Sequence, residues 1–389
     1  MQKFMLPKII GFCGVLVLIG LGLNQIVSPK PATNGAATSK IRPNGSASEQ
    51  SELSEYISRT AYTMSTSFYF RAVAPTKLNI DIEKLMDNAL KSMEAVTLGM
   101  NIYSPTSEIS KFNRSEPNKK FKLSPKTFEV LKYSHEIYKQ SDGTFDVTAK
   151  PLIKIWKNLQ PKREIKDPVT QQVMQTIGGL PTKAELLKAR KESQWSDIKI
   201  FDQGAMRLNK TVSVDLGGVA KGYSIDLATE YLKKAGCVGA LVNVGGDIRC
   251  FGTHPNGQKW RVSIRNPFAE DPNIPLKVIK ISDGAVCTSG NYERRRIIDG
   301  VSYSHIVDPR TMRPADLYPS VTVIAPTTMI ADAWATALSV LGPDGFKLIE
   351  PLGIEAMIVV GTKDKHEVKM TKRFHKYIDE KLTNSLKKK

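Results

Sequence analysis

The chain has 389 residues, 41% of them hydrophobic and 24% charged, an ordinary globular composition that excludes a disordered or fibrous protein. Lys and Arg (56) outnumber Asp and Glu (38), and the formal net charge of +18 indicates either a diffusely basic surface or anionic partners. Nucleic acid is not favoured among such partners, because no dense arginine block with interleaved aromatic residues occurs. The four cysteines are too few for a disulfide scaffold.

The N-terminus carries an export pattern. Lys3 and Lys8 precede an apolar run from Ile9 to Leu23, which is typical of a signal peptide or an uncleaved signal anchor over residues 1–27. Both alternatives place the rest of the chain on the extracytoplasmic face of the membrane, because the lysine-bearing end stays in the cytoplasm. Residues 28–52 are rich in Ser, Pro, Ala, Gly, Asn and Thr, and we expect them to form a flexible linker.

The rest of the chain divides into a folded body and a tail. We assign residues 53–370 to the body and residues 371–389, which are rich in lysine, to a basic C-terminal tail. The body holds three cysteines, an odd number, so at least one of them should be a free thiol. We expect all three to be small core residues: Cys237, Cys250 and Cys287.

Helical patterns alternate with strand patterns along the body. Apolar residues at 3/4 spacing from Ile82 to Met93 predict an amphipathic helix. The pair Ser124-Pro125 is an N-cap signal for a second helix, whose apolar stripe includes His135, so this histidine is expected to be packed rather than catalytic. A third helix is predicted at Lys183–Lys191, within a polar surface segment.

Strand-like runs follow in the second half, several of them spaced as hairpins. One hairpin turn is marked by Asp299-Gly300. The predicted strands are Thr211–Leu216, Gly239–Val244, Trp260–Ile264, Val278–Ile281, Ala285–Thr288, Arg296–Ile298, Val301–Ile306, Ser320–Ala325 and Glu355–Val360, with helices beginning at Gly217 and Thr328. This order predicts an α+β fold with mixed, largely antiparallel sheets and packed helices.

The predicted helix Thr328–Leu341 presents an unusual polar side. Asp332 and Thr336 lie one turn apart, opposite its apolar stripe, and their neighbours are small. A solvated helix face would normally carry Lys and Glu, so small residues indicate close approach to another group. A carboxylate and a hydroxyl at this spacing are hard oxygen ligands suited to Mg²⁺. The alternative is a polar face capped by neighbouring backbone.

A glycine turn joins a predicted strand to a helix at Asp215-Leu-Gly-Gly-Val-Ala-Lys-Gly222. Glycines let a phosphate approach the backbone, the helix N-terminus favours an anion, and Lys221 lies in the first turn. A tight turn without a ligand explains the segment equally well. It is not a Walker motif, and the chain also lacks the G-x-S-x-G, H-E-x-x-H and C-x-x-C patterns.

The order of the short segments is more specific than any one of them. They are TMST (63–66), YSPTSEISKFN (103–113), DGTFD (142–146), DLGGVAKGYSID (215–226), NVGGDIR (243–249), TSGNY (288–292), SHIVDPRT (304–311) and ADAWATAL (331–338). This series resembles the FAD:protein FMN transferase (ApbE-like) family. The resemblance extends from about Thr63 to Val360, which is most of the body.

The resemblance implies an ApbE-like flavin transferase domain over residues 53–370. Members of this family cleave the pyrophosphate of FAD with Mg²⁺ and join FMN through a phosphoester to a threonine of an acceptor protein, releasing AMP. Matching motif positions implies that the flavin or its polar groups contact Met64, Tyr103, Thr144, Phe145, Asp146, Asp215 and Ile306. Tyr103 would supply a ring to stack on the isoalloxazine.

The resemblance also implies which residues lie nearest the chemistry. The backbone carbonyl of Gly218, with Asp332 and Thr336, would coordinate Mg²⁺, and Lys221 would approach the pyrophosphate. His305 would accept the proton of the attacking threonine or position that threonine. A structural histidine that ties down a hairpin is an equally good explanation of His305.

Three residues depart from the family pattern. Ser65 and Met312 stand where glycine is usual, and Cys287 replaces a more usual small residue before TSG. These departures bear on loop geometry and fine specificity, and they leave the reaction class unchanged.

Two alternative functions remain open. An FAD pyrophosphatase would use water in place of threonine and release FMN and AMP, and an exported flavin-binding protein would have no turnover. The presence of Asp332, Thr336 and Lys221 argues against the second, because a carrier does not need a metal pair. A transferase outside the cytoplasm implies exported acceptor proteins, and membrane-associated electron-transfer subunits are the expected class.

Overall fold

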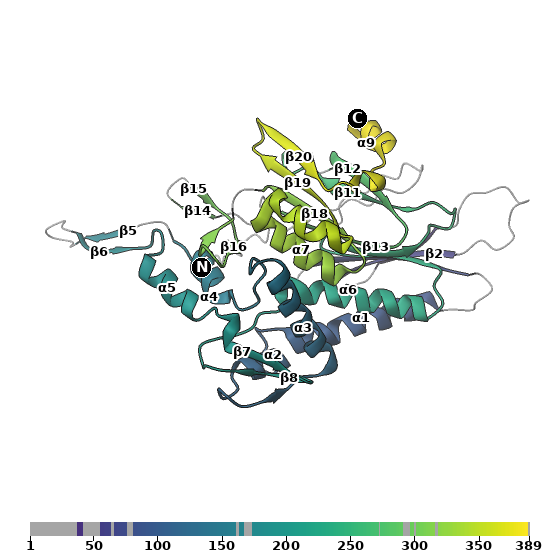
Figure 1. The fold of residues 1–389 in the computed structure, drawn as a ribbon. Helices are drawn as coiled ribbons and strands as arrows, with labels where there is room; N and C mark the ends of the chain where they lie inside the picture. Colours follow the sequence, from purple (N-terminus) through teal and green to yellow (C-terminus); the bar gives the residue numbers. More distant parts are fainter. Residues whose placement is uncertain are drawn as a thin grey trace, which may run out of the picture.

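A nine-stranded sheet forms the centre of the computed structural model (Figure 1), which describes residues 37–41, 55–63, 66–75, 81–160, 163–166, 173–271, 273–290, 296–298, 301–315 and 318–387. The strand order is β1-β2-β3-β9-β10-β13-β18-β19-β20, and all neighbouring strands are antiparallel. The strands are β1 (Ala37–Ile41), β2 (Glu55–Thr63), β3 (Thr66–Ala74), β9 (Gly239–Val244), β10 (Asp247–Gly252), β13 (Gly284–Gly290), β18 (Ser320–Ala325), β19 (Glu355–Gly361) and β20 (His366–Met370). The predicted α+β class is confirmed.

The central strands are buried on both faces of the sheet. In β9, Ala240 and Val242 belong to an apolar cluster on one face, and Leu241 belongs to a second cluster on the other. Because successive side chains of a strand point to opposite faces, a strand covered on both sides needs a continuous apolar run. The sequence GALVNV supplies one.

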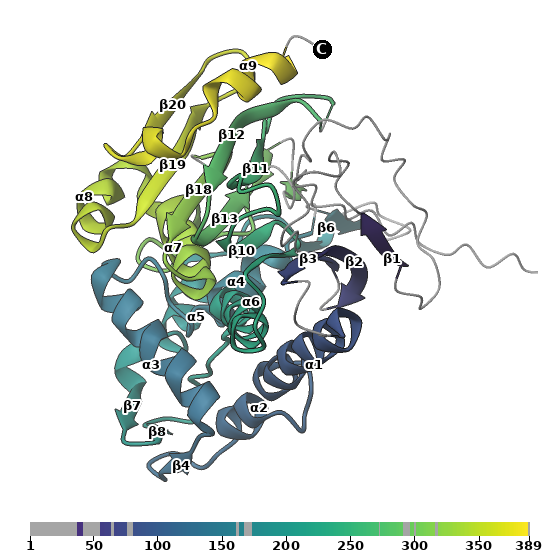
Figure 2. The ribbon, with the colours of Figure 1, turned by 90° about the vertical axis from the view of Figure 1, so that its right-hand side faces the viewer.

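Helices cover one face of the sheet. The helix α6 (Gly217–Lys234) packs on β9 and β10, α7 (Thr328–Leu341) packs on β13 and β18, and α1 (Ile82–Met100) lies along α6. Figure 2 shows α1 and α6 side by side below the sheet. The helix α1 begins where the Asp81 side chain accepts the Lys84 N–H at 3.0 Å, an N-cap that supports the predicted amphipathic helix.

The β11–β12 hairpin (Trp260–Arg265 and Pro275–Ile281) covers the other face. The chain after residue 370 joins it: the 3₁₀ helix η4 (Phe374–Tyr377) and the helix α9 (Glu380–Lys387) pack against the sheet and β12. Phe374 is fully buried, and the Thr383 hydroxyl accepts the Val278 N–H at 2.9 Å. The predicted boundary at residue 370 is therefore wrong, because residues 371–387 complete the apolar layer on this face.

The predicted flexible linker over residues 28–52 is also wrong in one part. Within it, β1 pairs with β2 from Ala37↔Thr60 to Ile41↔Tyr56. An edge strand gains backbone hydrogen bonds without needing an apolar face, so its polar sequence ATSKI carried no periodic signal.

The remaining elements form lobes around the sheet. They are α2 (Glu108–Asn113), α3 (Pro125–Gln140), α4 (Lys150–Lys157), α5 (Lys183–Lys191), α8 (Phe346–Ile349), the hairpins β5–β6 (Arg163–Lys166, Val173–Ile177), β14–β15 (Arg296–Ile298, Val301–Tyr303) and β16–β17 (Val307–Asp308, Arg313–Pro314), the sheet β4-β8-β7 (Phe121–Lys122, Gly204–Arg207, Ile198–Phe201), and the 3₁₀ helices η1 (Trp195–Asp197), η2 (Gly342–Gly345) and η3 (Glu350–Leu352). The β5–β6 hairpin extends away from the body beside α5 (Figure 1).

Most predicted helices and strands are confirmed, and two strands are corrected. The predicted strand Thr211–Leu216 does not form. The Asn113 side chain bonds the backbone of Val214 in place of a neighbouring strand: it accepts the Val214 N–H and donates to the Val214 carbonyl, both at 2.8 Å. The predicted strand Val301–Ile306 ends early, at Tyr303. His135 is packed as predicted, stacked on Trp195 with ring centroids 5.1 Å apart.

The three body cysteines are buried free thiols, as predicted. No helix in the described part of the chain is long and apolar enough to cross a bilayer. The predicted signal segment at residues 1–27 lies outside that part, as do Met64 and Ser65.

Candidate active site

The glycine turn before α6 leaves an open helix N-terminus. The Asp215 carboxylate accepts the Gly217 N–H at 3.0 Å, and the Asp215 N–H donates to the carbonyl of Val147 at 2.8 Å. Gly217 and Gly218 are exposed although the rest of the first turn is buried. The Asp215 cap occupies the Gly217 amide, so the exposed Gly218 is the first residue of α6 that can offer its amide to a ligand, and the positive end of the helix dipole faces the opening.

Lys221, one turn into α6, forms an ion pair with Asp247 at the start of β10. The Asp247 side chain is 5% exposed and the Lys221 side chain 33%, so the carboxylate of the pair is buried and the lysine is partly accessible to solvent. Burial by itself would lower the pKa of Lys221, but the nearby carboxylates of Asp247 and Asp332 outweigh it and hold that pKa above its ordinary value. Lys221 therefore stays a cation and can pair with a further anion.

Asp332 supplies a buried carboxylate next to this pair. It is 8% exposed, and its Oδ2 atom has no hydrogen-bond partner among the described residues. Burial, followed by the neighbouring charge of Asp247, raises the pKa of Asp332, while Lys221 and a backbone hydrogen bond from Gly222 oppose the rise. A buried carboxylate oxygen without a partner is costly, so this site is suited to a cation.

Two further oxygen donors lie beside Asp332. In an α-helix the carbonyl of residue i points at the amide of residue i+4, so the Gly218 carbonyl points at the Gly222 amide, where the Asp332 carboxylate also binds. Thr336 follows Asp332 by one turn of α7 and is half-buried. Its hydroxyl makes no hydrogen bond to a described residue, whereas the Ser339 hydroxyl on the same helix donates to the Ala335 carbonyl at 2.8 Å.

The close approach of α6 and α7 brings these groups together. A Cβ atom at Gly222 would lie 2.5 Å from the carbonyl oxygen of Thr328, so only glycine fits there. The Asp226 carboxylate accepts the N–H groups of Thr328 and Met329 at 2.7 and 2.8 Å and so caps α7 from α6. Burial raises the pKa of Asp226 to about 6.

The loop from Asp142 to Asp146 lies against the α6 N-terminus. Asp142 and Gly143 have φ angles of 53° and 72°, and the turn they make buries Thr144 and Phe145. The Phe145 ring lies 3.5 Å from where a Cβ of Gly218 would be. Asp146 is half-buried, its buried Oδ2 atom has no hydrogen-bond partner among the described residues, and desolvation raises its pKa.

A second loop, between β15 and β17, is bound to the first. Arg310 pairs with Asp308 at 3.0 Å and with Asp142 at 3.1 Å. His305 is exposed on this loop, and Ile306 is half-buried with its N–H donated to the Ser304 hydroxyl at 3.0 Å. The ion pairs of Arg310 thus bring the His305 segment to the edge of the Thr144–Asp146 segment.

The departure at Met312 has a structural cost. Met312 has a φ of 62°, a left-handed conformation that costs an ordinary residue about 1–2 kcal/mol and a glycine almost nothing. Its carbonyl accepts the Trp156 Nε1–H at 2.9 Å, and its side chain packs on the cluster around Trp156. These contacts offset the strain and explain how methionine is accommodated.

Tyr103 stands at the rim of the site with 78% of its surface exposed. Its N–H donates to the Asn101 side chain at 2.9 Å, and the Lys150 ammonium lies 5.5 Å from its ring centroid. An exposed, oriented ring can stack on a planar ligand.

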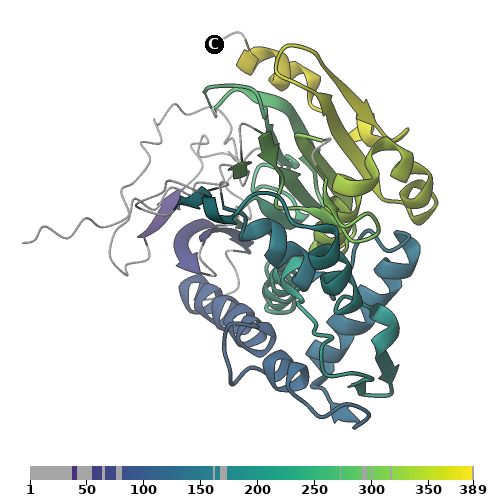
Figure 3. The ribbon, with the colours of Figure 1, turned by 90° about the vertical axis from the view of Figure 1, so that its left-hand side faces the viewer.

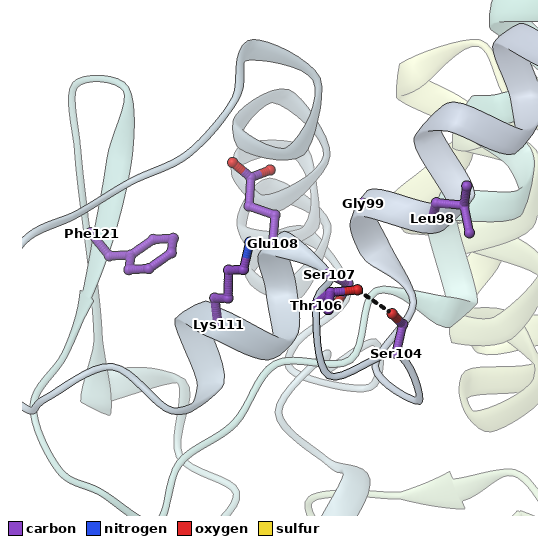
Figure 4. A pocket seen from close by; sticks show the side chains of 8 residues that line it. All are labelled: Leu98, Gly99, Ser104, Thr106, Ser107, Glu108, Lys111 and Phe121. Carbon is purple, nitrogen blue, oxygen red and sulfur yellow. Dashed lines mark hydrogen bonds between the residues drawn. The ribbon is translucent and has the colours of Figure 1, made fainter.

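The same loop borders a separate cavity. It has a volume of about 510 Å³ and is lined by Leu98, Gly99, Ser104, Thr106, Ser107, Glu108, Lys111 and Phe121. Figure 4 shows these side chains, with the Ser104 and Thr106 hydroxyls 3.0 Å apart. None of the predicted site residues lines it, so this cavity is distinct from the cluster around Lys221.

Known proteins resemble this chain in sequence. The sequence pattern of the ApbE family matches residues 61–358. The chain belongs to the ApbE family. An FAD:protein FMN transferase from Vibrio cholerae is 30% identical over 312 residues, which cover 80% of this chain and 89% of that protein. One from Escherichia coli is 28% identical, covering 81% of this chain and 87% of that protein.

Solved ApbE structures have the same fold. The flavin transferase ApbE from Vibrio cholerae superimposes with a TM-score of 0.71 at 29% identity, covering 83% of this chain and 99% of that one. The apo form of flavinyl transferase ApbE from Pseudomonas stutzeri gives 0.71 at 25% identity, covering 84% and 98%. The expected ApbE-like fold is therefore confirmed.

The ApbE-family chain brings most of the predicted site residues into one region. Lys221 on α6 and Asp332 on α7 form its inner end, Gly218 lies at the exposed start of α6, and the Thr144–Asp146 and His305–Ile306 loops form its rim. Met64 lies outside the described residues.

Two carboxylates that organise this region were not among the predicted site residues. Asp247, the partner of Lys221, follows the turn Gly245-Gly246 and could have been suspected from that position. Asp226 gave no signal, because its capped helix lies 102 residues away.

Proposed function

We propose that this chain is an FAD:protein FMN transferase that cleaves FAD with Mg²⁺, joins FMN through a phosphoester to a threonine of an exported acceptor protein, and releases AMP. One observation supports it above all others. A lysine held as a cation stands beside a buried carboxylate with an unpartnered oxygen, at an open helix N-terminus. Such a site binds a phosphate group together with a divalent cation.

The donor set fits magnesium. The unpartnered Oδ2 atom of Asp332, the carbonyl of Gly218 and the free hydroxyl of Thr336 are hard oxygen donors, which Mg²⁺ prefers. No imidazole or thiolate replaces them, and the nearby Cys287 is buried with its pKa raised well above its ordinary value, mainly by burial. When bound there, Mg²⁺ would neutralise charge on the pyrophosphate.

Different residues would bind the pyrophosphate and the flavin of FAD. The exposed amide of Gly218 and the ammonium of Lys221 would bind the pyrophosphate. The Phe145 segment and the ring of Tyr103 would hold the flavin, with Asp146 and Asp215 binding its polar groups. Most of the rate enhancement would come from positioning and charge neutralisation.

Transfer is a single displacement at phosphorus. The threonine oxygen forms a bond to the FMN phosphorus, the bond from that phosphorus to the bridging oxygen breaks, and AMP leaves with the bonding electrons. His305 would accept the threonine proton, because it is exposed at the rim where an acceptor arrives. A protein substrate needs such an exposed base.

We further propose that the reaction takes place outside the cytoplasm. The support is the apolar run of residues 9–23 behind Lys3 and Lys8, which would export the body or anchor it at the membrane. Exported acceptors, such as membrane-associated electron-transfer subunits with threonine-linked flavin, would then be within reach.

The test uses the full chain with FAD, Mg²⁺ and a threonine-bearing acceptor domain, and weighs the intact acceptor. An FMN-sized mass gain that disappears with EDTA, in Asp332→Ala, and in an acceptor with the threonine replaced by valine would establish the transferase. Free FMN and AMP without a mass gain would make the chain a pyrophosphatase. Bound, uncleaved FAD would make it a flavin-binding protein.

A further inference from the structure

A separate lobe of the molecule adjoins the rim of the site. The helices α4 and α5 pack with β14, β15 and β16 around an apolar cluster of their own, formed by Leu152, Trp156, Leu159, Ala189, Ile298 and Val307. Figure 3 shows this side of the molecule, with both helices facing the viewer. The lobe is connected to the site at two points, since α4 begins four residues after Asp146 and Trp156 donates to the Met312 carbonyl at 2.9 Å.

The outward side of this lobe exposes apolar side chains. Of the eight large apolar side chains that the described residues expose, four belong to this lobe: Ile153 (38%) on α4, Leu187 (43%) on α5, Leu180 (54%) just before α5 and Val301 (52%) on β15. Single exposed apolar residues need no explanation, but a concentration beside a catalytic rim is typical of a protein interface.

The same side is strongly basic. The two helices carry seven basic residues and one acidic residue, Glu185, and Glu185 is occupied in the capping box with Thr182. Lys154, Lys157 and Lys188 are exposed, and none of them forms an ion pair with a carboxylate that the structure describes. We call the exposed side chains of Ile153, Lys154, Lys157, Leu187 and Lys188 the α4–α5 face.

The α4–α5 face begins beside Tyr103, which the proposed function assigns to the flavin. Lys150, in the first turn of α4, lies over the Tyr103 ring, and the eight residues of α4 extend about 12 Å away from that point. The hydrogen bond from Trp156 to Met312 ties α4 to the loop that carries His305, so an acceptor whose threonine reached His305 would lie close to this face.

We propose that the α4–α5 face docks the acceptor protein through a segment in which acidic side chains alternate with apolar ones. This inference rests on the proposed function. Unpaired lysines would select and steer the acidic residues, and Ile153 and Leu187 would anchor the apolar ones. A membrane surface is less favoured as the occupant, because the face adjoins the catalytic rim.

The experiment compares two charge-reversal variants of the full chain with wild type. The test variant is K154E/K157E/K188E, and the matched control K365E/K372E/K376E reverses three exposed lysines in the β19–β20 region instead. Initial rates are measured against the concentration of an acceptor domain that wild type flavinylates, and separately against FAD. Circular dichroism checks that both variants fold.

We expect the test variant to raise the KM for the acceptor about tenfold or more, with the KM for FAD and the kcat at saturating acceptor unchanged. Its acceptor KM should also respond less to salt than that of wild type. The control should match wild type in all of these.

The docking proposal would be overturned if the acceptor KM of the test variant were unchanged, or if the acceptor KM of the control variant rose equally. If the acceptor KM were unchanged but the test variant bound anionic vesicles less well than wild type, the face would be assigned to a membrane instead. Failure of the proposed function would look different: wild type itself would give no adduct with any acceptor, and the docking proposal would fall with it.

Discussion

Removing Lys221 should destabilise the protein even without substrate or metal. In Lys221→Met the apolar stem stays and the charge goes, so Asp247, at 5% side-chain exposure, loses its counter-charge while Asp332 remains close. Breaking a buried ion pair by removing one partner costs about 3–5 kcal/mol. Because the Lys221 side chain is 33% exposed and water can replace part of it, we expect a loss of about 2–3 kcal/mol.

The partner variant gives the control. Asp247→Asn leaves Lys221 with access to water, so it should cost less, about 1 kcal/mol. In the double variant neither charge is stranded, and the loss should be smaller than the sum of the single losses by about 1–2 kcal/mol.

Urea unfolding at pH 7 with EDTA measures all four proteins. The reasoning would be refuted if the loss of stability in the double variant equalled the sum of the two single losses to within about 0.5 kcal/mol. The lysine would then stabilise the fold through its apolar stem alone. The pair is near the site but the readout is independent of catalysis, so the result also separates the structural role of Lys221 from its role toward phosphate.

Three other predictions concern the helices that carry the site. Gly222→Ala should lower the free energy of unfolding by about 2–3 kcal/mol, because its Cβ would lie 2.5 Å from the Thr328 carbonyl oxygen. The control is Gly99→Ala in α1, where an added Cβ would have no atom within 4 Å; it should raise the free energy of unfolding by about 0.5–1 kcal/mol. Burial raises the pKa of Asp226 to about 6, above its value of about 3.9 in the unfolded chain. The folded state therefore favours the protonated carboxyl, and the stability that Asp226 contributes is complete below pH 4. This contribution falls by up to about 3 kcal/mol as the pH rises through 6. Asp226→Asn should lack this loss when unfolding is followed from pH 4 to 7, and an identical pH slope in both proteins would contradict the assignment. Thr336→Val should weaken Mg²⁺ binding about tenfold or more in calorimetry with an unchanged unfolding midpoint, since its hydroxyl bonds no described residue; a lowered midpoint would show that the hydroxyl is structural.

The helices were predictable where their signals are local. Ser124 caps α3, its side chain accepting the Thr127 N–H at 3.5 Å, and Pro125 occupies the first helical position, as the pair predicted. The absence of a strand at Thr211–Leu216 could not be predicted in this way. A strand-like segment becomes a strand only if a neighbouring strand supplies its backbone hydrogen bonds, and the local sequence does not say whether one does. At Val214 the Asn113 side chain supplies them instead.

The same distinction applies to the site. Asp332 and Thr336 share one helix, so their common face followed from a spacing of four residues. The partner of Lys221 is Asp247 on another element, and no periodicity within one segment relates them. The family resemblance supplied the segments in order, but it did not say which carboxylate stands against the lysine.

Under the proposed function, the contact between α6 and α7 would control the magnesium end of the site more than the flavin end. Gly222 sets how near the helices can come, and Asp226 caps one from the other. How closely the Gly218 carbonyl approaches Asp332 depends on that distance, whereas the Phe145 ring lies against Gly218 in the first turn of α6 and is also held by the apolar core. Changes at Gly222 or Asp226, neither of which we place in contact with substrate, should therefore impair magnesium binding before they impair flavin binding. Titrating the Gly222→Ala variant with Mg²⁺ and with FMN would separate the two, and an equal loss of both affinities would contradict the argument.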